Sequence, residues 1–257
     1  MKQVSAKQEK RTVQYWLLYA SMPILVLAVW QGLDAANIIK PYTMPSPVAI
    51  VQATIEYIQN GKLFGDIAIS LIRVLEGFFA GLAIAFVIGI AAALSRKVEI
   101  FTDFCLQILR PIPPIAWIPL AILWFGIGET SKVFIIFIGA FFPIFVNIVD
   151  GIQAIDKKYY ELAAVYEVPK WQFIRHVIIP GALPAIMTGI RVGMGNAWVC
   201  VVAAEMIGAT QGVGFMLTDG RSMSRPDVVI LGMLLVGIVG KIMDDVLLRI
   251  RAKVVVR

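Results

Sequence analysis

The stretch ELAAVYEVPKWQFIRHVIIPGALP, residues 161–184, lies between two of the most apolar regions of the chain. Its charged or titratable side chains are those of Glu161, Glu167, Lys170, Arg175 and His176. The composition favours helix, but the residue before a proline is pushed out of helical geometry, so a break is expected where Val168 precedes Pro169. The pattern predicts two short helices outside the membrane that connect two membrane spans.

The whole chain has the composition of a membrane protein. Its 257 residues are 59% hydrophobic and 16% charged, and the mean hydropathy is +0.82. A water-soluble domain of this length could not bury so much apolar surface. The net charge of +6 does not indicate nucleic acid, because the basic residues lie at the termini and between apolar runs and form no binding motif.

Intervals without charge predict where the chain crosses the membrane, since a helix needs about 20 apolar residues to do so. The third interval is rich in proline and is expected to be kinked or broken. The sixth charge-free interval is short, so the charged residues that follow it must face protein or lipid headgroups. We therefore expect an all-α membrane protein, one domain over 1–257, with six transmembrane helices at 12–33, 77–95, 111–128, 133–149, about 183–207 and from about Pro226 onward.

Lysine and arginine outside these spans predict the orientation, because cytoplasmic loops carry most of them. They concentrate in the N-terminus, the turn at 96–97, the segment 150–182 and the tail. Both termini are therefore expected in the cytoplasm, with cytoplasmic segments at 1–12, 156–182 and 248–257. A cleavable signal peptide is the alternative for the first apolar run, but that run is longer than the usual hydrophobic region of a signal peptide.

The segment SPVAIVQATIEYIQNG, residues 46–61, predicts a short surface helix on the opposite side. Ser46 is a suitable N-cap and Pro47 a suitable first helical residue. Its apolar side chains repeat at helical spacing, which predicts a face packed on the membrane domain. That face comprises Val48, Val51, Ile55 and Ile58.

The loop between the fourth and fifth spans resembles the EAA loop of bacterial ABC importer permeases. That motif is written EAA, three residues, Gly, nine residues, I-x-L-P, and here Glu161 to Ala163, position 167 and 177–180 match its spacing. The chain is similar to the permeases of nitrate, taurine, aliphatic sulfonate and bicarbonate importers over about residues 44–250. The matching runs are SLIRVLEGF (70–78), LRPIPPIAWIPLAILWFGIGETSK (109–132), LPAIMTGIRVGMGNAW (183–198) and VVAAEMIGATQGVGFM (201–216).

The resemblance implies a multi-pass protein of the bacterial inner membrane whose cytoplasmic loop is a coupling helix. It implies two permease subunits, expected to be identical, with the path between them. Two ATP-binding-cassette ATPase subunits would bind on the cytoplasmic face, and an extracytoplasmic binding protein would deliver the substrate. The residues expected to couple to the ATPase are Glu161, Ala163, Ala164, Tyr166, Glu167, Pro169, Lys170, Trp171 and Pro180.

One position departs from the motif, because Glu167 replaces the usual glycine. A glycine there would allow a turn with positive φ. We expect Val168 and Pro169 to form the turn in another way, with the break between the two short helices at 167–169.

The chain itself is not expected to be an enzyme. It lacks the phosphate-binding motif G-x-x-x-x-G-K-[ST], because Gly61-Lys62 and Gly240-Lys241 have no glycine at the required upstream position. We therefore expect no catalytic residue, no metal site and no bound cofactor, with ATP and Mg²⁺ used by the partner ATPase. The cysteines and the single histidine have no spacing typical of metal ligands.

Ionisable groups within spans are costly and by default belong to a pathway or a partner contact. Four residues of the fifth span are candidates for the translocation path, namely Arg191, Asn196, Trp198 and Glu205. Arg191 has three interpretations: it binds a passing anion, reaches lipid headgroups or pairs with a carboxylate. Arg110 is expected to pair with Asp103 or a lipid phosphate.

Two other classes of function compete with a permease driven by an ATPase. A secondary transporter or channel running on an ion gradient would contain many carboxylates in its spans, and few are present. A membrane-embedded enzyme would contain clustered histidines, cysteines or carboxylates. We expect the substrate to be a small anion such as taurine, an alkanesulfonate, nitrate or bicarbonate. A neutral or aromatic nutrient carried by the same kind of permease is the alternative.

Overall fold

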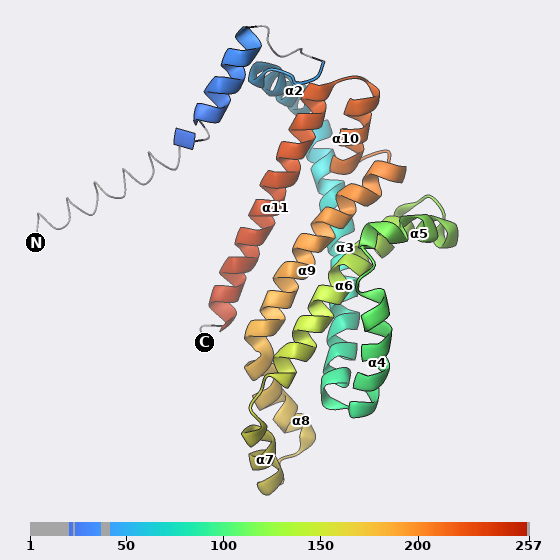
Figure 1. The fold of residues 1–257 in the computed structure, drawn as a ribbon, viewed down its shortest axis with the longest axis vertical. Helices are drawn as coiled ribbons and strands as arrows, with labels where there is room; N and C mark the ends of the chain where they lie inside the picture. The colour runs from blue at the N-terminus through green and yellow to red at the C-terminus, as the bar shows by residue number, and fades with distance from the viewer. Residues whose placement is uncertain (1–20, 23, 37–41, 256–257) are drawn as a thin grey trace, which may run out of the picture. The chain divides into compact units, whose positions relative to one another are not determined.

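A computed structural model describes residues 21–22, 24–36 and 42–255, without the side chains of Cys105 and Val255. Within these residues the regular structure is helical and contains no strand (Figure 1). Part of the predicted first span and the predicted cytoplasmic segment 1–12 lie outside them. The elements are α2 (Pro47–Gln59), α3 (Lys62–Leu94), α4 (Arg96–Leu109), η1 (Pro114–Trp117), α5 (Ile118–Phe125), α6 (Glu129–Gln153), α7 (Lys157–Val165), α8 (Lys170–Phe173), η2 (Ile174–Ile178), α9 (Ile179–Gly208), α10 (Val213–Ser222) and α11 (Pro226–Val255).

Several of these helices have the length and composition of membrane spans. Four qualify, namely Lys62–Leu94, Glu129–Gln153, Lys170–Gly208 and Pro226–Val254. A fifth is obtained if the bent pair Arg96–Leu109 and Pro114–Phe125 is one span, and a shorter apolar helix covers Ile24–Ala35. The all-helical membrane fold is confirmed, whereas the expected count of six spans is not.

The expected break in the third apolar interval is present. The chain bends by 87° between α4 and the η1–α5 pair, where Pro111, Pro113 and Pro114 lack the N–H groups that a continuing helix needs. With 8 residues, α5 is about 12 Å long, far less than the roughly 30 Å of a bilayer core. The interval 111–128 is therefore not a spanning helix by itself, and any crossing there requires α4.

The chain divides into two compact units, Met1–Leu63 with Asp219–Leu231, and Phe64–Thr218 with Gly232–Arg257. In the larger unit α6 packs along α9 (Figure 1). A Cβ atom on Gly193 would lie 2.7 Å from the Ile144 side chain, and one on Gly189 would lie 2.7 Å from Asn147 Cβ. The absence of these atoms lets the two backbones approach closely. The residue numbers of the contacting pairs decrease along α9 as they increase along α6, so the two helices are antiparallel.

The start of α3 lies at the same end of this unit as the start of α6. A Cβ atom on Gly77 would lie 2.6 Å from Ile136, and one on Gly89 would lie 3.0 Å from Ile148. Positions on both helices therefore rise together, and the helices are parallel. It follows that α3 and α6 begin where α9 ends, and that the segment between α6 and α9 lies at the opposite end.

In the smaller unit, α2 begins as its sequence predicts. Ser46 Oγ accepts from the N–H of Ala49 at 3.1 Å, and Pro47 occupies the first turn. The expected inward face, however, is wrong. Its members Val48, Val51, Ile55 and Ile58 are all exposed.

The buried face of α2 lies elsewhere on the helix, at Ile50, Ala53 and Tyr57. Both faces have helical spacing and apolar side chains, so periodicity alone could not choose between them. Glu56 forms an ion pair with Arg225 at 2.8 Å. The hydrogen bond from this guanidinium lowers the pKa of Glu56.

The close approach of α6 and α9 can be tested with a matched pair of substitutions on α9. Gly193→Ala is expected to lower stability by about 1–3 kcal/mol through overpacking, because its Cβ would also lie 3.0 Å from the Ala140 carbonyl oxygen. Gly195→Ala is the control, since no atom lies within 4 Å of its added Cβ. Thermal unfolding in detergent measures both, and equal midpoints would contradict the packing described.

Candidate functional site

The segment between α6 and α9 folds into two helical pieces separated by a tight turn. α7 ends at Val165 and α8 begins at Lys170, so the expected break at 167–169 is confirmed. The expected way of forming it is wrong. Glu167 itself adopts the left-handed conformation, with φ +51°, which glycine occupies without strain.

Backbone hydrogen bonds explain why the chain accepts this conformation at Glu167. Its N–H donates to the carbonyl of Ala164 at 3.2 Å, and the N–H of Val168 donates to the carbonyl of Ala163 at 2.9 Å. This pair of bonds is the Schellman motif, which satisfies the last carbonyls of a helix and requires a left-handed residue at this position. Pro169 follows and cannot continue α7. The turn therefore has the positive φ that a glycine would allow, although Glu167 occupies the position.

The second helical piece is continuous with the following span, which corrects the expectation of two separate short helices. α8 passes through the π-helical turn η2 into α9, and Lys170–Gly208 forms one 39-residue helix. In η2 the N–H of Ile179 donates to the carbonyl of Ile174, five residues earlier. Pro180, next in the chain, has no N–H to offer the His176 carbonyl, so a regular α-helical ladder is already interrupted here.

The turn and its flanking helices expose large apolar side chains. Tyr166 is 75% exposed, Trp171 67% and Leu162 52%. Of the predicted coupling residues, Ala163 is half-buried and all the others are exposed. A groove of about 360 Å³ runs between the two helical pieces and is lined by Tyr159, Leu162, Ala163, Tyr166, Val168, Gln172, Phe173, His176 and Val177. We call the segment 157–178 the elbow, and its exposed apolar surface is typical of a protein-binding site.

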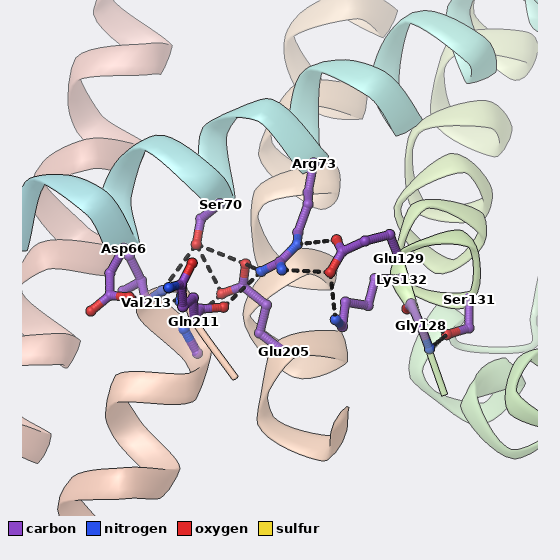
Figure 2. Close-up of polar contacts among 12 residues, drawn as sticks. Asp66, Ser70, Arg73, Gly128, Glu129, Ser131, Lys132, Glu205, Gln211 and Val213 are labelled. Atoms are coloured by element: carbon purple, nitrogen blue, oxygen red, sulfur yellow. Dashed lines mark hydrogen bonds and ion pairs between the residues drawn. The ribbon is translucent and has the colours of Figure 1, made fainter. Parts of the chain in front are cut away.

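At the opposite end of the larger unit lies a charge network in which Arg73, Lys132 and Glu205 are buried and Glu129 is exposed (Figure 2). Arg73 on α3 is 4% exposed, and its guanidinium donates to both carboxylate oxygens of Glu129 at 2.5 and 2.8 Å. Its third nitrogen donates to Glu205 and to the carbonyl of Gln211, both at 2.8 Å. Lys132 donates to Glu129 at 2.9 Å. Two basic groups thus meet two carboxylates, and the charges balance.

Glu205, which is 0% exposed, is the centre of this network. Besides Arg73, Ser70 Oγ donates to it at 2.8 Å and the N–H of Gly214 donates at 2.9 Å. The N–H of Val213 donates in turn to Ser70 Oγ at 2.9 Å. Because a buried charge is tolerated only when it is paired and hydrogen-bonded, these contacts fix the ends of α3, α6 and α9 to the start of α10.

Three residues of α3 were missed in the sequence analysis, namely Asp66, Ser70 and Arg73. Asp66 accepts from the N–H of Gly212 at 2.8 Å. The signal was present in the spacing, because residues four and three positions apart share one helical face. Gly77 continues that face towards Ile136.

The structure places the predicted path residues in different settings. Trp198 is buried and its indole N–H donates to the carbonyl of Val236 at 2.9 Å. Arg191 forms a two-pronged ion pair with Asp244, at 2.5 and 2.8 Å, which is one of its three expected interpretations. Glu205 lies in the buried network, whereas Asn196 is exposed. Their part in a translocation path stays a prediction.

The strain at Glu167 can be tested by restoring the glycine of the motif. Glu167→Gly is expected to stabilise the turn by about 1 kcal/mol, the penalty for a side chain in the left-handed region. Glu161→Gly, the same substitution inside α7, is expected to destabilise by a similar amount. Hydrogen exchange of the elbow amides should slow in the first variant and quicken in the second. Faster exchange in both would contradict the role assigned to φ at residue 167.

The buried network can be tested by removing its central cation. Arg73→Met would leave the Glu205 carboxylate buried without a counter-charge, which is expected to cost about 3–5 kcal/mol of unfolding free energy. Arg96→Met removes an exposed ion pair with Glu99 and is expected to cost less than about 1 kcal/mol. Unfolding in mixed micelles compares the two. Similar losses would show that the network does not bear on stability.

Known proteins share both this architecture and this sequence. A protein of Bacillus subtilis (strain 168) named as an aliphatic sulfonates transport permease, SsuC, is 40% identical over 230 residues, 90% of this chain and 83% of that protein. The taurine transport system permease protein TauC of Escherichia coli (strain K12) is 32% identical over 225 residues, 86% of this chain and 82% of that protein.

A solved structure extends the comparison to the fold. The inward-facing MetNI methionine ABC transporter has a chain that matches with a TM-score of 0.64 at 20% identity, over 72% of this chain and 92% of that chain. Residues 85–251 match the family described as binding-protein-dependent transport system inner membrane component. With this match, and with relatives that are transport permeases, the chain belongs to the family of binding-protein-dependent transport system inner membrane components.

Proposed function

We propose that this chain is the permease subunit of an ABC importer for a small anion, and that a separate ATPase drives it through the elbow. The observation that carries the proposal is the exposed apolar groove of the elbow on a helix that continues into a membrane span. A groove of this kind suits a protein partner. ATP and Mg²⁺ would bind to that partner, because this sequence lacks a phosphate-binding loop.

The continuity of the helix supports a mechanical role for the elbow. The 39-residue helix Lys170–Gly208 is about 58 Å long at 1.5 Å per residue. A force on the elbow would therefore move α9 directly, whereas a flexible loop would absorb it. At the far end the Arg73–Glu205 network holds α9 to α3 and α6. The far end can thus serve as a fixed point while the cytoplasmic end of the helix moves.

The exposed face of α9 supports a path along this helix. Val192 is 45% exposed and Val199 is 59% exposed, and Asn196 lies between them on the same face. We infer that Asn196 borders the path, and that Arg191, Trp198 and Glu205 hold α9 in place beside it. A second copy of the chain would close the path, two ATPase subunits would bind the two elbows, and an extracytoplasmic binding protein would deliver the anion. Both termini would lie in the cytoplasm.

Substitution in the groove tests whether the elbow binds an ATPase. Tyr166→Glu places a charge in the apolar groove and is expected to lower recovery of the ATPase with the tagged chain by at least about tenfold, since an unpaired charge in an interface is costly. Tyr166→Phe keeps the ring and should retain the partner. Lys97→Glu introduces a carboxylate in the exposed first turn of α4 and should have no effect.

The measurement is the amount of ATP-hydrolysing protein co-purified from native membranes, together with ATP-dependent uptake in proteoliposomes. The proposal is wrong if the unmodified chain captures no such protein and its transport is indifferent to ATP. It is also wrong about the elbow if Tyr166→Glu retains the ATPase as well as Lys97→Glu does.

A further inference from the structure

A second cavity lies in the larger unit, halfway along the spans and far from the elbow. Its volume is about 320 Å³, and it lies where the centres of α6 and α9 meet the bend after α4. It is lined by Arg110, Ile112, Pro114, Ile138, Gly139, Phe142, Pro143, Val146, Asn147, Val192 and Asn196.

Arg110 is the only charged residue of this lining. Asp103, a predicted partner, instead accepts from Gln107 Nε2 at 2.8 Å, and Arg110 forms no ion pair with any residue that the structure describes. Arg110 is exposed and lies at the bend between Arg96–Leu109 and Pro114–Phe125; an arginine within a membrane segment is costly unless water, a carboxylate or a bound anion faces it. No carboxylate lines this cavity, so the guanidinium is available to an anion.

Two amides complement the guanidinium in the cavity. Asn196 is exposed on α9, and its NH₂ group can donate to an oxyanion. Asn147 differs, because its Nδ2 already donates to the carbonyl of Pro143 at 2.8 Å. Arg110 and Asn196 are therefore the two donors that an anion would meet. Guanidinium groups favour planar or multi-oxygen anions because they donate in a fixed fork.

The remaining wall is apolar and suits a hydrocarbon tail. Ile138, Phe142 and Val146 on α6 face the cavity together with Val192 on α9. A bare inorganic anion would leave these side chains in contact with water. An oxyanion with a short alkyl chain would cover them, and each buried methylene would strengthen binding by about fourfold.

We propose that this cavity is a transit site for small organic oxyanions, in which Arg110 and Asn196 bind the charged head and the α6 wall contacts the tail. The inference rests on the proposed function, because it assigns the substrate head group to residues of this chain. The same chemistry could be supplied by the phosphate of a lipid headgroup. We assign the site to the transported anion, because its size and apolar wall fit a short tail of a few carbons.

The experiment uses the transporter purified with whatever ATPase it retains, in nanodiscs of phosphatidylcholine alone or mixed equally with phosphatidylglycerol. The probe is trifluoromethanesulfonate, and binding is read from its ¹⁹F line width without ATP. Arg110→Gln is expected to weaken binding at least about tenfold, since it removes a charged hydrogen bond, and Asn196→Leu by about three- to tenfold. Arg110→Lys should retain part of the affinity. Arg96→Gln, which removes an exposed cation of α4 outside the cavity, should bind as the unmodified chain does.

Competition tests the tail and the source of the oxyanion. Propanesulfonate should displace the probe at lower concentration than methanesulfonate, and nitrate should be the weakest competitor. The proposal is overturned if Arg110→Gln binds the probe as well as Arg96→Gln does. It is also overturned if the site belongs to a lipid headgroup. In that case phosphatidylglycerol would abolish probe binding, and the Arg110→Gln variant would differ from the unmodified chain only in retaining less phosphatidylglycerol on purification. Because the titration needs neither ATP nor the ATPase, its failure is distinguishable from failure of the coupling proposal.

Discussion

The ion pair between Arg73 and Glu205 is the constraint on which the rest of the larger unit depends. Glu205 is 0% exposed and Arg73 only 4%, so neither charge can turn to water when its partner is displaced. Their hydrogen bonds reach α3, α6, α9 and the start of α10. A buried charge that loses its partner is costly, because neither water nor another charge replaces the lost contact. The helix ends joined by this network are therefore expected to form or separate together.

The charge network makes one end of the larger unit rigid, and the exposed elbow lies at the other end. The helices approach closely along their length, as at Gly189 against the backbone of Ile144, so α9 cannot easily bend away from α6. Under the proposed coupling, a displacement of the elbow would therefore tilt or shift the whole helix. The cavity beside Arg110 lies between these two ends, where α6 and α9 meet the bend after α4.

Much of this arrangement could be predicted from the sequence, because apolar length and proline positions act locally. The break at 167–169, the N-cap at Ser46 and the interruption after α4 all follow from short-range rules. The buried face of α2 could not be chosen, since two apolar faces compete on one helix. The Arg73 network joins residues more than a hundred positions apart, and only the packing of α3 on α9 brings them together.

The location of the candidate site could also be predicted from the sequence, but its backbone conformation could not. The spacing of the EAA-like motif located the elbow, but not the left-handed Glu167, because a Schellman turn can impose that conformation on a residue that does not favour it. Neither did it show that α8 continues through a π-helical turn into α9. That continuity depends on how the chain accommodates Pro180. A sequence alone is compatible with either an interrupted helix or a helix with a π-bulge at this position.

The π-helical turn Ile174–Ile178 also sets an angle. Each residue of an α-helix advances the chain by about 100° around the axis, so the one extra residue held in this turn rotates the elbow relative to the span by that amount. The direction in which the protein presents its groove therefore depends on five residues, two of which, His176 and Val177, also line the groove. A chain with a regular α-helical turn here would present the same side chains in a different direction, and a binding partner would have to approach them from another side.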